Sequence, residues 1–375
     1  MDALFLSDPG FWDDRKPFAP GHFPGIIPQS EGLDGHVLFE TSGSSGRPQW
    51  LALSKQALLL SAAAVNRHLR VSEDSCWGVA LPAQHVGGFG VAARAFEAAC
   101  RLQVFSWRWE ARAFLAWLGH HNVTHTSLVP TQVHDLVAAN LVAPPTLVAV
   151  VVGGGQLDAR TGQAARELGW PVLASYGLTE AGSQVATQSL DLLDSSYQPA
   201  PLPILPIWQT RISPTGQLSI AGPGLFSGSL RHEGHAWQFS PRPDAWHLTA
   251  DRVALANHQL TPLGRLDSLV KVLGELVDPA AIEDQLLELS NGKLTPGSFA
   301  VLALPDTRAG HRLVPVFEAA VDPVLAVAVL DAYQKQAPGY RRLQPPQVLA
   351  GLPRSPLGKL RRADALAALI SGARA

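Results

Sequence analysis

Short apolar runs alternate with helical patterns through the middle of the chain, and this alternation limits the fold more than any other feature. The predicted strands occupy residues 76–82, 124–130, 146–152 and 171–177, of which 146–152 is nearly continuously apolar, and the helical patterns between them occupy residues 114–118, 132–139 and 158–168. Strands that are apolar throughout, rather than at every second residue, are typical of parallel sheets covered on both faces. We therefore predict an α/β fold built around a parallel sheet.

The sequence pattern changes on either side of this block. Residues 36–40 and 50–54 predict two further strands, and the prolines after residue 197 introduce short alternating strands, typical of a small β-barrel-like part. Beyond residue 265, strands and helices alternate as in a small α+β domain. We expect a large N-terminal domain of parallel and mixed sheets with flanking helices, residues 1–265, and a C-terminal domain, residues 266–375.

Composition and charge exclude several classes of protein. The chain is 46% hydrophobic and 16% charged, and 29 basic residues against 31 acidic ones show no basic cluster, which argues against a nucleic-acid partner. The two cysteines, Cys76 and Cys100, cannot form a disulfide framework. The N-terminus does not resemble a secretory leader, and no apolar run approaches the roughly 20 residues of a membrane span. We expect a cytoplasmic protein without a membrane span.

The strongest chemical signal is the polar loop between the first two predicted strands. It consists of Thr41, Ser42, Gly43, Ser44, Ser45, Gly46, Arg47 and Pro48. Glycines let backbone N–H groups approach a phosphate, hydroxyls add donors, and Arg47 adds charge. The loop lacks the Gly-Lys-Ser/Thr ending of a Walker A loop. It predicts a phosphate site, with a flexible polar hairpin as the alternative.

Two more groups follow neighbouring predicted strands. Gly153, Gly154 and Gly155 come directly after the strand at 146–152, and Tyr176-Gly-Leu-Thr-Glu180 ends the next one. Ligands of parallel sheets bind beyond the carboxyl ends of the strands. The bare glycine backbone suits a flat ring, although a simple turn would also explain it, and Glu180 is a suitable carboxylate for Mg²⁺.

Four single residues are weaker candidates. Asp251 could accept hydrogen bonds from ribose hydroxyls, but with Arg265 it could equally form a surface ion pair. Lys359 stands beside a glycine and could enter a site as a point charge, or could be a solvated lysine before the last helix. His85 precedes two glycines and is either catalytic or structural.

The order and spacing of these motifs resemble the adenylate-forming acyl-CoA synthetase superfamily, from about residue 36 to about residue 365. Ser183-Gln184 after the Glu180 motif, and Arg94 after His85, are most similar to its o-succinylbenzoate–CoA ligase branch, which serves menaquinone biosynthesis. The resemblance implies an AMP-forming acid–thiol ligase that uses ATP, Mg²⁺ and CoA. A carboxylate would attack the α-phosphate of ATP, and the thiol of CoA would then attack the acyl carbon.

The resemblance also implies a role for each candidate residue. The implied cofactor-binding residues are Thr41 to Arg47 for the β- and γ-phosphates, Gly153, Gly154, Gly155, Tyr176 and Gly177 for adenine, and Asp251 and Arg265 for ribose. The implied catalytic residues are His85, Thr179, Glu180 (also the metal ligand) and Lys359, and the implied substrate residues are Arg94, Ser183 and Gln184. Asp267 would be the hinge of a mobile C-terminal domain that carries Lys359.

Three departures from the family pattern leave alternatives open. Gln49 replaces a lysine after the phosphate loop, and Val272-Leu273 replaces a more glycine-rich pair, which weakens the expectation of a CoA step. The segment ahead of Thr41 is shorter than in the family, so we expect exposed apolar sheet and a possible homodimer. The first 35 residues are expected to cover a surface without building a sheet. The alternatives are a ligase for another aryl or fatty acid, and a degenerate, non-catalytic nucleotide-binding homologue.

Overall fold

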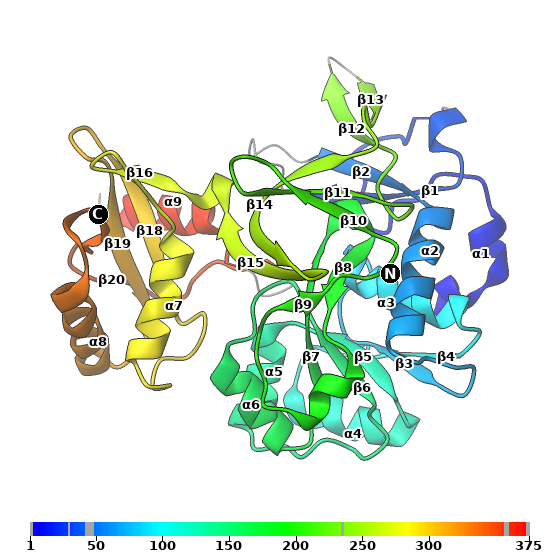
Figure 1. Cartoon of the computed structure of the whole chain (residues 1–375), viewed down its shortest axis with the longest axis horizontal. Helices are drawn as coiled ribbons and strands as arrows, with labels where there is room; N and C mark the ends of the chain where they lie inside the picture. The colour runs from blue at the N-terminus through cyan, green and yellow to red at the C-terminus, as the bar shows by residue number, and fades with distance from the viewer. Residues whose placement is uncertain (1–2, 29–30, 42–48, 234–235, 356–359, 373–375) are drawn as a thin grey trace. The chain divides into compact units, whose positions relative to one another are not determined.

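The computed structural model describes residues 3–28, 31–41, 49–233, 236–355 and 360–372. The chain divides into two compact units (Figure 1). The first unit comprises residues up to 249 together with 253–262, and the second comprises 250–252 together with residues from 263 onward.

A six-stranded sheet forms the centre of the first unit, in the order β4-β3-β5-β6-β7-β8. Its strands are β3 (Cys76–Val79), β4 (Arg101–Val104), β5 (His125–Leu128), β6 (Ala149–Val152), β7 (Val172–Leu178) and β8 (Ser183–Thr187). The strands β4 to β7 pair in parallel, which confirms the prediction for the apolar runs, and β8 pairs antiparallel with β7. The sheet is therefore mixed rather than purely parallel.

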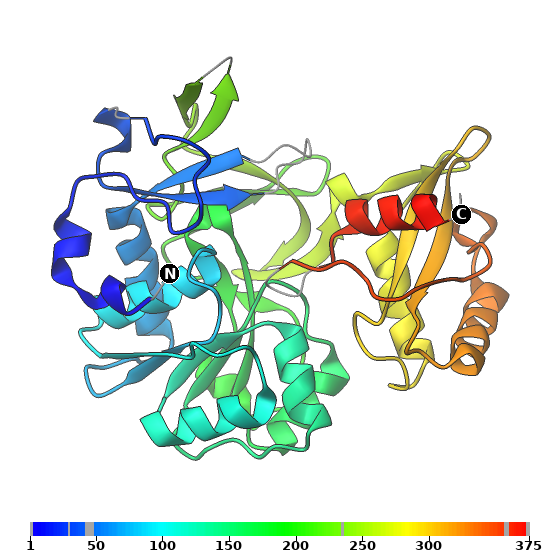
Figure 2. The same cartoon turned by 180° about the vertical axis from the view of Figure 1, so that it is seen from behind.

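Helices cover both faces of this sheet (Figures 1 and 2). They are α2 (Lys55–His68), α3 (Val86–Glu97), α4 (Ala111–His121), α5 (Pro130–Ala138) and α6 (Ala159–Glu167). The helices α2 and α3 pack together on one face, and α5 packs between α4 and α6 on the other. Asp158 caps the N-terminus of α6, because its side chain accepts a hydrogen bond from Thr161 N at 2.9 Å. Helix α3 was not predicted from the sequence.

The N-terminal segment packs onto α3. It contains η1 (Ala3–Ser7), α1 (Pro9–Asp13) and η2 (Glu31–Leu33), and it makes one β-bridge, between Phe18 and Val37, which confirms that it covers a surface. The ring of Trp12 stacks on Phe96 at 5.1 Å, and Lys55 Nζ donates to the carbonyl oxygen of Phe11 at 2.5 Å. The segment thus covers the α3 side of the first unit, and the homodimer remains a prediction.

The predicted barrel-like part consists of two antiparallel sheets in the structure. One sheet has the order β1-β2-β12-β13, with β1 (His36–Thr41), β2 (Gln49–Ser54), β12 (Gly228–Glu233) and β13 (Ala236–Pro241). The other has the order β10-β11-β14-β15-β9, with β9 (Leu202–Pro203), β10 (Gln209–Ile212), β11 (Gln217–Ala221), β14 (His247–Ala256) and β15 (Gln259–Arg265). The region after residue 197 therefore does not form a separate barrel, because its strands β12 and β13 extend the hairpin of β1 and β2.

The second unit is a sheet with helices on two faces. The sheet has the order β17-β16-β19-β18, and β20 pairs with β19; the strands are β16 (Val270–Val272), β17 (Glu275–Val277), β18 (Phe299–Asp306), β19 (Gly310–Glu318) and β20 (Gln347–Leu349). Val301 and Phe317 pack toward α7 (Pro279–Leu289) and α8 (Pro323–Gln336), whereas Leu302 and Val316 pack toward α9 (Arg362–Gly372), as expected for side chains that alternate along a strand (Figure 2).

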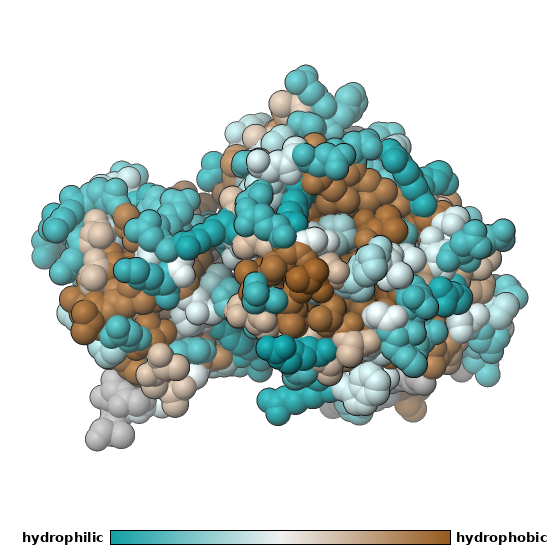
Figure 3. All heavy atoms as spheres, turned by 90° about the horizontal axis from the view of Figure 1, so that it is seen from below, coloured by the Kyte–Doolittle hydropathy of each residue, from teal (hydrophilic) through white to brown (hydrophobic). Residues whose placement is uncertain are grey.

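Among the residues that the structure describes, no helix is long and apolar enough to cross a bilayer. In the view from below, apolar side chains form separate groups with polar side chains between them (Figure 3).

Candidate active site

The predicted glycine and hydroxyl motifs of the first unit come together at the carboxyl ends of β6 and β7. These strands are paired in parallel, with Val152 opposite Ala174, so the residues that follow them lie at the same edge of the sheet. Gly154 has a positive φ of 76°, and a Cβ at Gly155 would lie 3.5 Å from Pro130. The three glycines therefore leave uncovered backbone at this edge.

The Glu180 motif lies next to the hairpin that carries the predicted phosphate loop. Thr179 and Glu180 are in η3 (Thr179–Ala181), which directly follows β7 and contacts β2. Phe226 N donates to the backbone oxygen of Glu180 at 2.8 Å. Thr41 ends β1 opposite Gln49, and its hydroxyl donates to the Gln49 carbonyl at 3.3 Å. Residues 42–48, from Ser42 to Arg47 and Pro48, lie outside the described residues.

A register shift after Tyr176 brings Gly177 against Ser183. The pairing of β7 with β8 is irregular between Tyr176 and Gly177. A Cβ at Gly177 would lie only 1.7 Å from the carbonyl oxygen of Ser183, so only glycine fits here. Ser183 itself has a positive φ of 118°, which non-glycine residues rarely adopt. The close approach of these two residues fixes where the Ser183 hydroxyl lies.

Arg94 is the only arginine of α3, and its side chain points into the first unit. The residue is 2% exposed; Nη2 donates to Ser183 Oγ at 3.0 Å, and Nη1 donates to Ser127 Oγ at 3.3 Å. No carboxylate among the described residues forms an ion pair with it. Burial lowers the pKa of Arg94 to about 9, so the guanidinium is still charged at neutral pH. A buried cation without an anion is costly, and its contacts with two hydroxyls compensate only part of that cost.

Gln184 is a second buried polar residue of the candidate site and follows Ser183 in β8. Its Oε1 accepts a hydrogen bond from Thr187 Oγ1 at 2.5 Å, but its Nε2 has no partner in the structure. Because the side chain is 3% exposed, water does not readily satisfy this donor. Buried donors left unpaired are rare in folded proteins, and they mark places where a ligand can supply the acceptor.

His85 lies at the N-cap position of α3. Its Nε2 is buried and has no hydrogen-bond partner, and burial lowers the pKa of the ring, with the Glu40 carboxylate opposing the shift. The imidazole is therefore neutral at pH 7. The structure places His85 beside the end of β1, and a catalytic role for it stays a prediction.

The remaining predicted residues belong to the second unit. Arg265 Nη1 lies 2.8 Å from Asp251 Oδ1 in an ion pair whose side chains are 49% and 13% exposed, which is the surface pair that the sequence left open as an alternative. Asp267 lies in η5 (Leu266–Ser268), and its role as a hinge stays a prediction. Lys359 lies outside the described residues.

The turn that departs from the family pattern keeps a glycine-like backbone. Leu273 and Gly274 connect β16 and β17 and have positive φ values of 53° and 91°. A leucine in the left-handed region costs roughly 1–2 kcal/mol. The turn therefore has a shape that glycine would adopt more easily, although leucine occupies the position.

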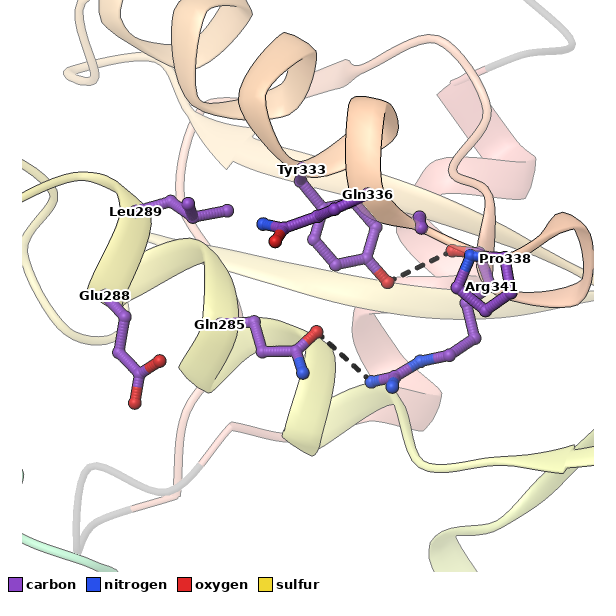
Figure 4. Close-up of a pocket in the computed structure, with 8 residues that line it drawn as sticks. Gln285, Glu288, Leu289, Tyr333, Gln336, Pro338 and Arg341 are labelled. Atoms are coloured by element: carbon purple, nitrogen blue, oxygen red, sulfur yellow. Dashed lines mark hydrogen bonds between the residues drawn. The ribbon is translucent and has the colours of Figure 1, made fainter.

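A cavity of about 370 Å³ in the second unit is lined by none of the predicted site residues (Figure 4). It lies between α7 and α8. The Tyr333 hydroxyl donates to the Arg341 carbonyl at 3.2 Å, and Arg341 Nη2 donates to Gln285 Oε1 at 3.3 Å. The side chains of Tyr333, Arg341 and Gln285 therefore have hydrogen-bond partners within the lining.

Two features were settled only by the structure. His120 and His121 lie at the end of α4 and His125 lies in β5, and no group of three or more potential metal ligands gathers among the described residues. Conversely, Ser127 and Thr187 were missed as site residues. No pattern in β5, whose sequence is His-Thr-Ser-Leu, distinguishes Ser127 from its polar neighbours.

Comparison with known proteins agrees with this arrangement. Residues 28–230, more than half of the chain, match the family model for AMP-binding enzymes. The 2-succinylbenzoate–CoA ligase of Escherichia coli is 30% identical over 280 residues, which are 74% of this chain and 57% of that protein. The corresponding ligase of Enterococcus faecalis is 24% identical over 339 residues, or 85% of this chain and 67% of that protein.

Solved structures share the fold. The o-succinylbenzoate CoA synthetase of Bacillus subtilis in complex with its acyl-adenylate intermediate superposes with a TM-score of 0.73 at 24% identity, over 87% of this chain and 68% of that one. The same enzyme with ATP and a magnesium ion gives a TM-score of 0.72 at 23% identity, over 88% of this chain and 69% of that one.

The chain belongs to the AMP-binding enzyme family. Its 2-succinylbenzoate–CoA ligase relatives are 24–31% identical over most of the chain, but the chain spans only 57% of the length of the Escherichia coli protein.

Proposed function

We propose that the protein is an ATP-dependent acyl-CoA ligase that activates a carboxylic acid as its adenylate. The acid carboxylate attacks the α-phosphorus and releases pyrophosphate; the CoA sulfur then attacks the acyl carbon, loses its proton and releases AMP. Such displacements depend mainly on positioning and on neutralising charge. The edge of the central sheet offers backbone for adenine at Gly153 to Gly155 and a carboxylate at Glu180.

Each predicted residue has a role in this proposal. Ser42 to Arg47 and Thr41 cradle the phosphates, and Tyr176 and Gly177 flank the adenine. Asp251 and Arg265 bind ribose, and Lys359 bridges the acid and the α-phosphate. Glu180 is the type of ligand that Mg²⁺ prefers, and the ion would neutralise charge on the leaving pyrophosphate. Thr179 and His85 are the remaining catalytic residues of the proposal.

We further propose that the acid carries a second carboxylate, as 2-succinylbenzoate does. The observation that carries this proposal is Arg94: it is buried and charged, it contacts the hydroxyls of Ser127 and Ser183 and the Trp77 ring, and no carboxylate among the described residues pairs with it. A second carboxylate would pair with the guanidinium, and Gln184 Nε2 could donate to an oxygen of the same ligand. A fatty acid would leave the cation buried and unpaired.

Purified protein should be incubated with ATP, Mg²⁺ and CoA and a panel of acids, with the CoA ester measured by mass spectrometry. We expect 2-succinylbenzoate to give the ester and benzoate and octanoate to give little. Turnover of a monoacid instead would refute the substrate class but keep the reaction class. Absence of both ester and adenylate with every acid would favour a non-catalytic homologue.

The CoA step is the less supported half of the proposal. Leu273 and Gly274 both have the positive φ values that a glycine pair would readily adopt. We take this as support for the CoA step. Measuring adenylate and ester separately in the same assay distinguishes a complete ligase from one that stops at the adenylate.

A further inference from the structure

The guanidinium of Arg94 is held by contacts from three other elements of the first unit. Its Nη2 donates to the hydroxyl of Ser183 in β8, and its Nη1 donates to the hydroxyl of Ser127 in β5. Its Cζ lies over the ring of Trp77 in β3, 5.2 Å from the ring centroid. A guanidinium has five N–H donors, so the two hydrogen bonds leave further donors for a ligand.

The Trp77 ring stabilises the cation in part without occupying those donors. An aromatic face attracts a cation through its quadrupole, and the attraction is stronger where water is excluded, as it is between the buried Trp77 and Arg94. A protein carboxylate in the same place would accept two hydrogen bonds from the guanidinium and would compete with an acidic ligand. The ring therefore supports the charge and leaves it available to an anion.

Asn66, a buried residue of α2, fixes the orientation of this ring. Trp77 Nε1 donates to Asn66 Oδ1 at 3.2 Å. The Nδ2 of the same amide donates to the carbonyl oxygen of Arg94 at 2.8 Å and to Glu97 Oε2 at 2.7 Å. The indole is only a donor and the other two groups are only acceptors, so one orientation of the amide satisfies all three. One side chain thus ties the ring to the helix that carries the cation.

Helix packing and satisfaction of buried groups do not by themselves require Asn66. The carbonyl oxygen of Arg94 already accepts a hydrogen bond from Ala98 N at 3.0 Å. A buried indole needs no amide either: Trp170 Nε1 donates directly to the backbone oxygen of Leu141 at 2.7 Å. Burying an amide side chain costs free energy that a backbone acceptor does not add. What Asn66 contributes is a fixed geometry between the ring and the cation.

We propose that Asn66 and Trp77 are positioning residues that hold the Arg94 guanidinium in the orientation that receives the second carboxylate of the acid. Neither needs to touch the substrate, because both act through Arg94. The inference rests on the proposed function, in which Arg94 binds that carboxylate. Without the ring and its anchor, the long arginine side chain would lose its single orientation, and binding of the carboxylate would have to restore it.

The first test measures KM for 2-succinylbenzoate and KM for ATP in the CoA-ester assay. We expect Trp77→Leu to raise KM for 2-succinylbenzoate on the order of 10-fold, with kcat and KM for ATP little changed. Trp77→Phe keeps a ring and should raise it less, and Asn66→Ala, which releases the ring, should also raise it. The matched control is Trp170→Leu, because Trp170 is 1% exposed and Trp77 0%. It should keep both KM values.

A merely structural role predicts a different result. The variants would then lower the folded fraction measured by circular dichroism, and the maximal rate with it, while both KM values stayed at wild type as in Trp170→Leu. That outcome would overturn the proposal. In the Arg94→Met background, Trp77→Leu should cause no further rise in KM for 2-succinylbenzoate, and a further rise would also overturn it. Where Trp77→Leu does not fold, Trp77→Phe and Asn66→Ala take its place in each test.

Urea unfolding tests the same claim without turnover. Because a cation without its ring is less stable, Arg94→Met should favour the folded state on the order of 10-fold more in the Trp77→Leu background than in wild type, which is about 1.4 kcal/mol. Arg94→Met and Trp170→Leu should be additive. Additivity with Trp77→Leu would overturn the proposal. If wild type forms no ester from 2-succinylbenzoate, the proposed function fails, and this cycle still decides whether Trp77 supports the cation.

Discussion

The two units hold their buried arginines in different ways. In the first unit Arg94 contacts the hydroxyls of Ser127 and Ser183 and lies 5.2 Å from the Trp77 ring, with no ion pair among the described residues. In the second unit Arg362 meets Glu283 through two hydrogen bonds. A paired cation recovers much of its desolvation cost from its partner, and an unpaired one does not. The charge of Arg94 is therefore left uncompensated, as the proposed second carboxylate of the substrate requires, whereas Glu283 neutralises the charge of Arg362.

The largest expected effect comes from Arg94→Met, which removes the unpaired charge and keeps most of the volume. We expect kcat/KM for 2-succinylbenzoate to fall on the order of 100-fold, because the second carboxylate loses a charged partner worth about 3 kcal/mol. We expect the free energy of unfolding in urea to rise by about 1 kcal/mol, because a desolvated cation is gone. A fall in the free energy of unfolding would instead mean that Arg94 stabilises the fold, and Arg94 and Arg362 would then not differ in role.

Acid should weaken the first unit through His125. Burial lowers the pKa of this ring from 6.5 to about 4, so the unfolded chain binds a proton at higher pH than the folded one does. The stability from the neutral ring is complete above pH 6.5 and is lost as pH falls toward 4, an effect of about 3 kcal/mol at most. Urea unfolding between pH 7 and 4 measures it. His125→Asn should flatten the curve, whereas the exposed His120→Gln should leave it unchanged.

Gly177→Ala tests how the site around Arg94 is built. A methyl group would lie 1.7 Å from the Ser183 carbonyl, so β8 has to move, and we expect a loss of about 2 kcal/mol in the free energy of unfolding. Gly153→Ala is the matched control for stability, because a Cβ there meets nothing within 4 Å. Equal stability of the two variants would show that the approach of Gly177 to Ser183 is looser than described.

Asp251→Asn should have the smallest effect on stability. Its pair with Arg265 is partly exposed, and such pairs contribute about 0–1 kcal/mol. If Asp251 binds ribose, KM for ATP should rise about 10-fold, because a charged acceptor is lost. Asp34→Asn, which breaks the exposed pair with Arg15 at 2.7 Å in the first unit, is the control. The same KM in both variants would leave Asp251 as a surface ion pair.

The sequence predicted the parts of the fold that depend on local pattern. The strand β6 follows from its continuous apolar run, and β3, β5 and β7 follow from their alternation with helical patterns. Helix α3 was missed because its sequence, VGGFGVAARAFE, contains three glycines, which disfavour a helix in isolation. Burial of most of its residues against the sheet compensates for that low propensity.

The contacts of the candidate site residues could not be predicted from the sequence. Arg94 and Ser183 were identified from motif position, yet Ser127 depends on how α3 packs over β5, which no local pattern encodes. The register shift at Gly177 likewise results from tertiary pairing. The pairing of Arg362 with Glu283, 79 residues apart in the chain, has the same origin.

The most direct test of the account is acid-dependent exchange of labelled pyrophosphate into ATP, measured for wild type and Lys359→Ala with 2-succinylbenzoate and with benzoate. The account predicts exchange by wild type that requires 2-succinylbenzoate, is weak with benzoate, and disappears in Lys359→Ala. Exchange that is equally strong with benzoate, or that persists without Lys359, would contradict it.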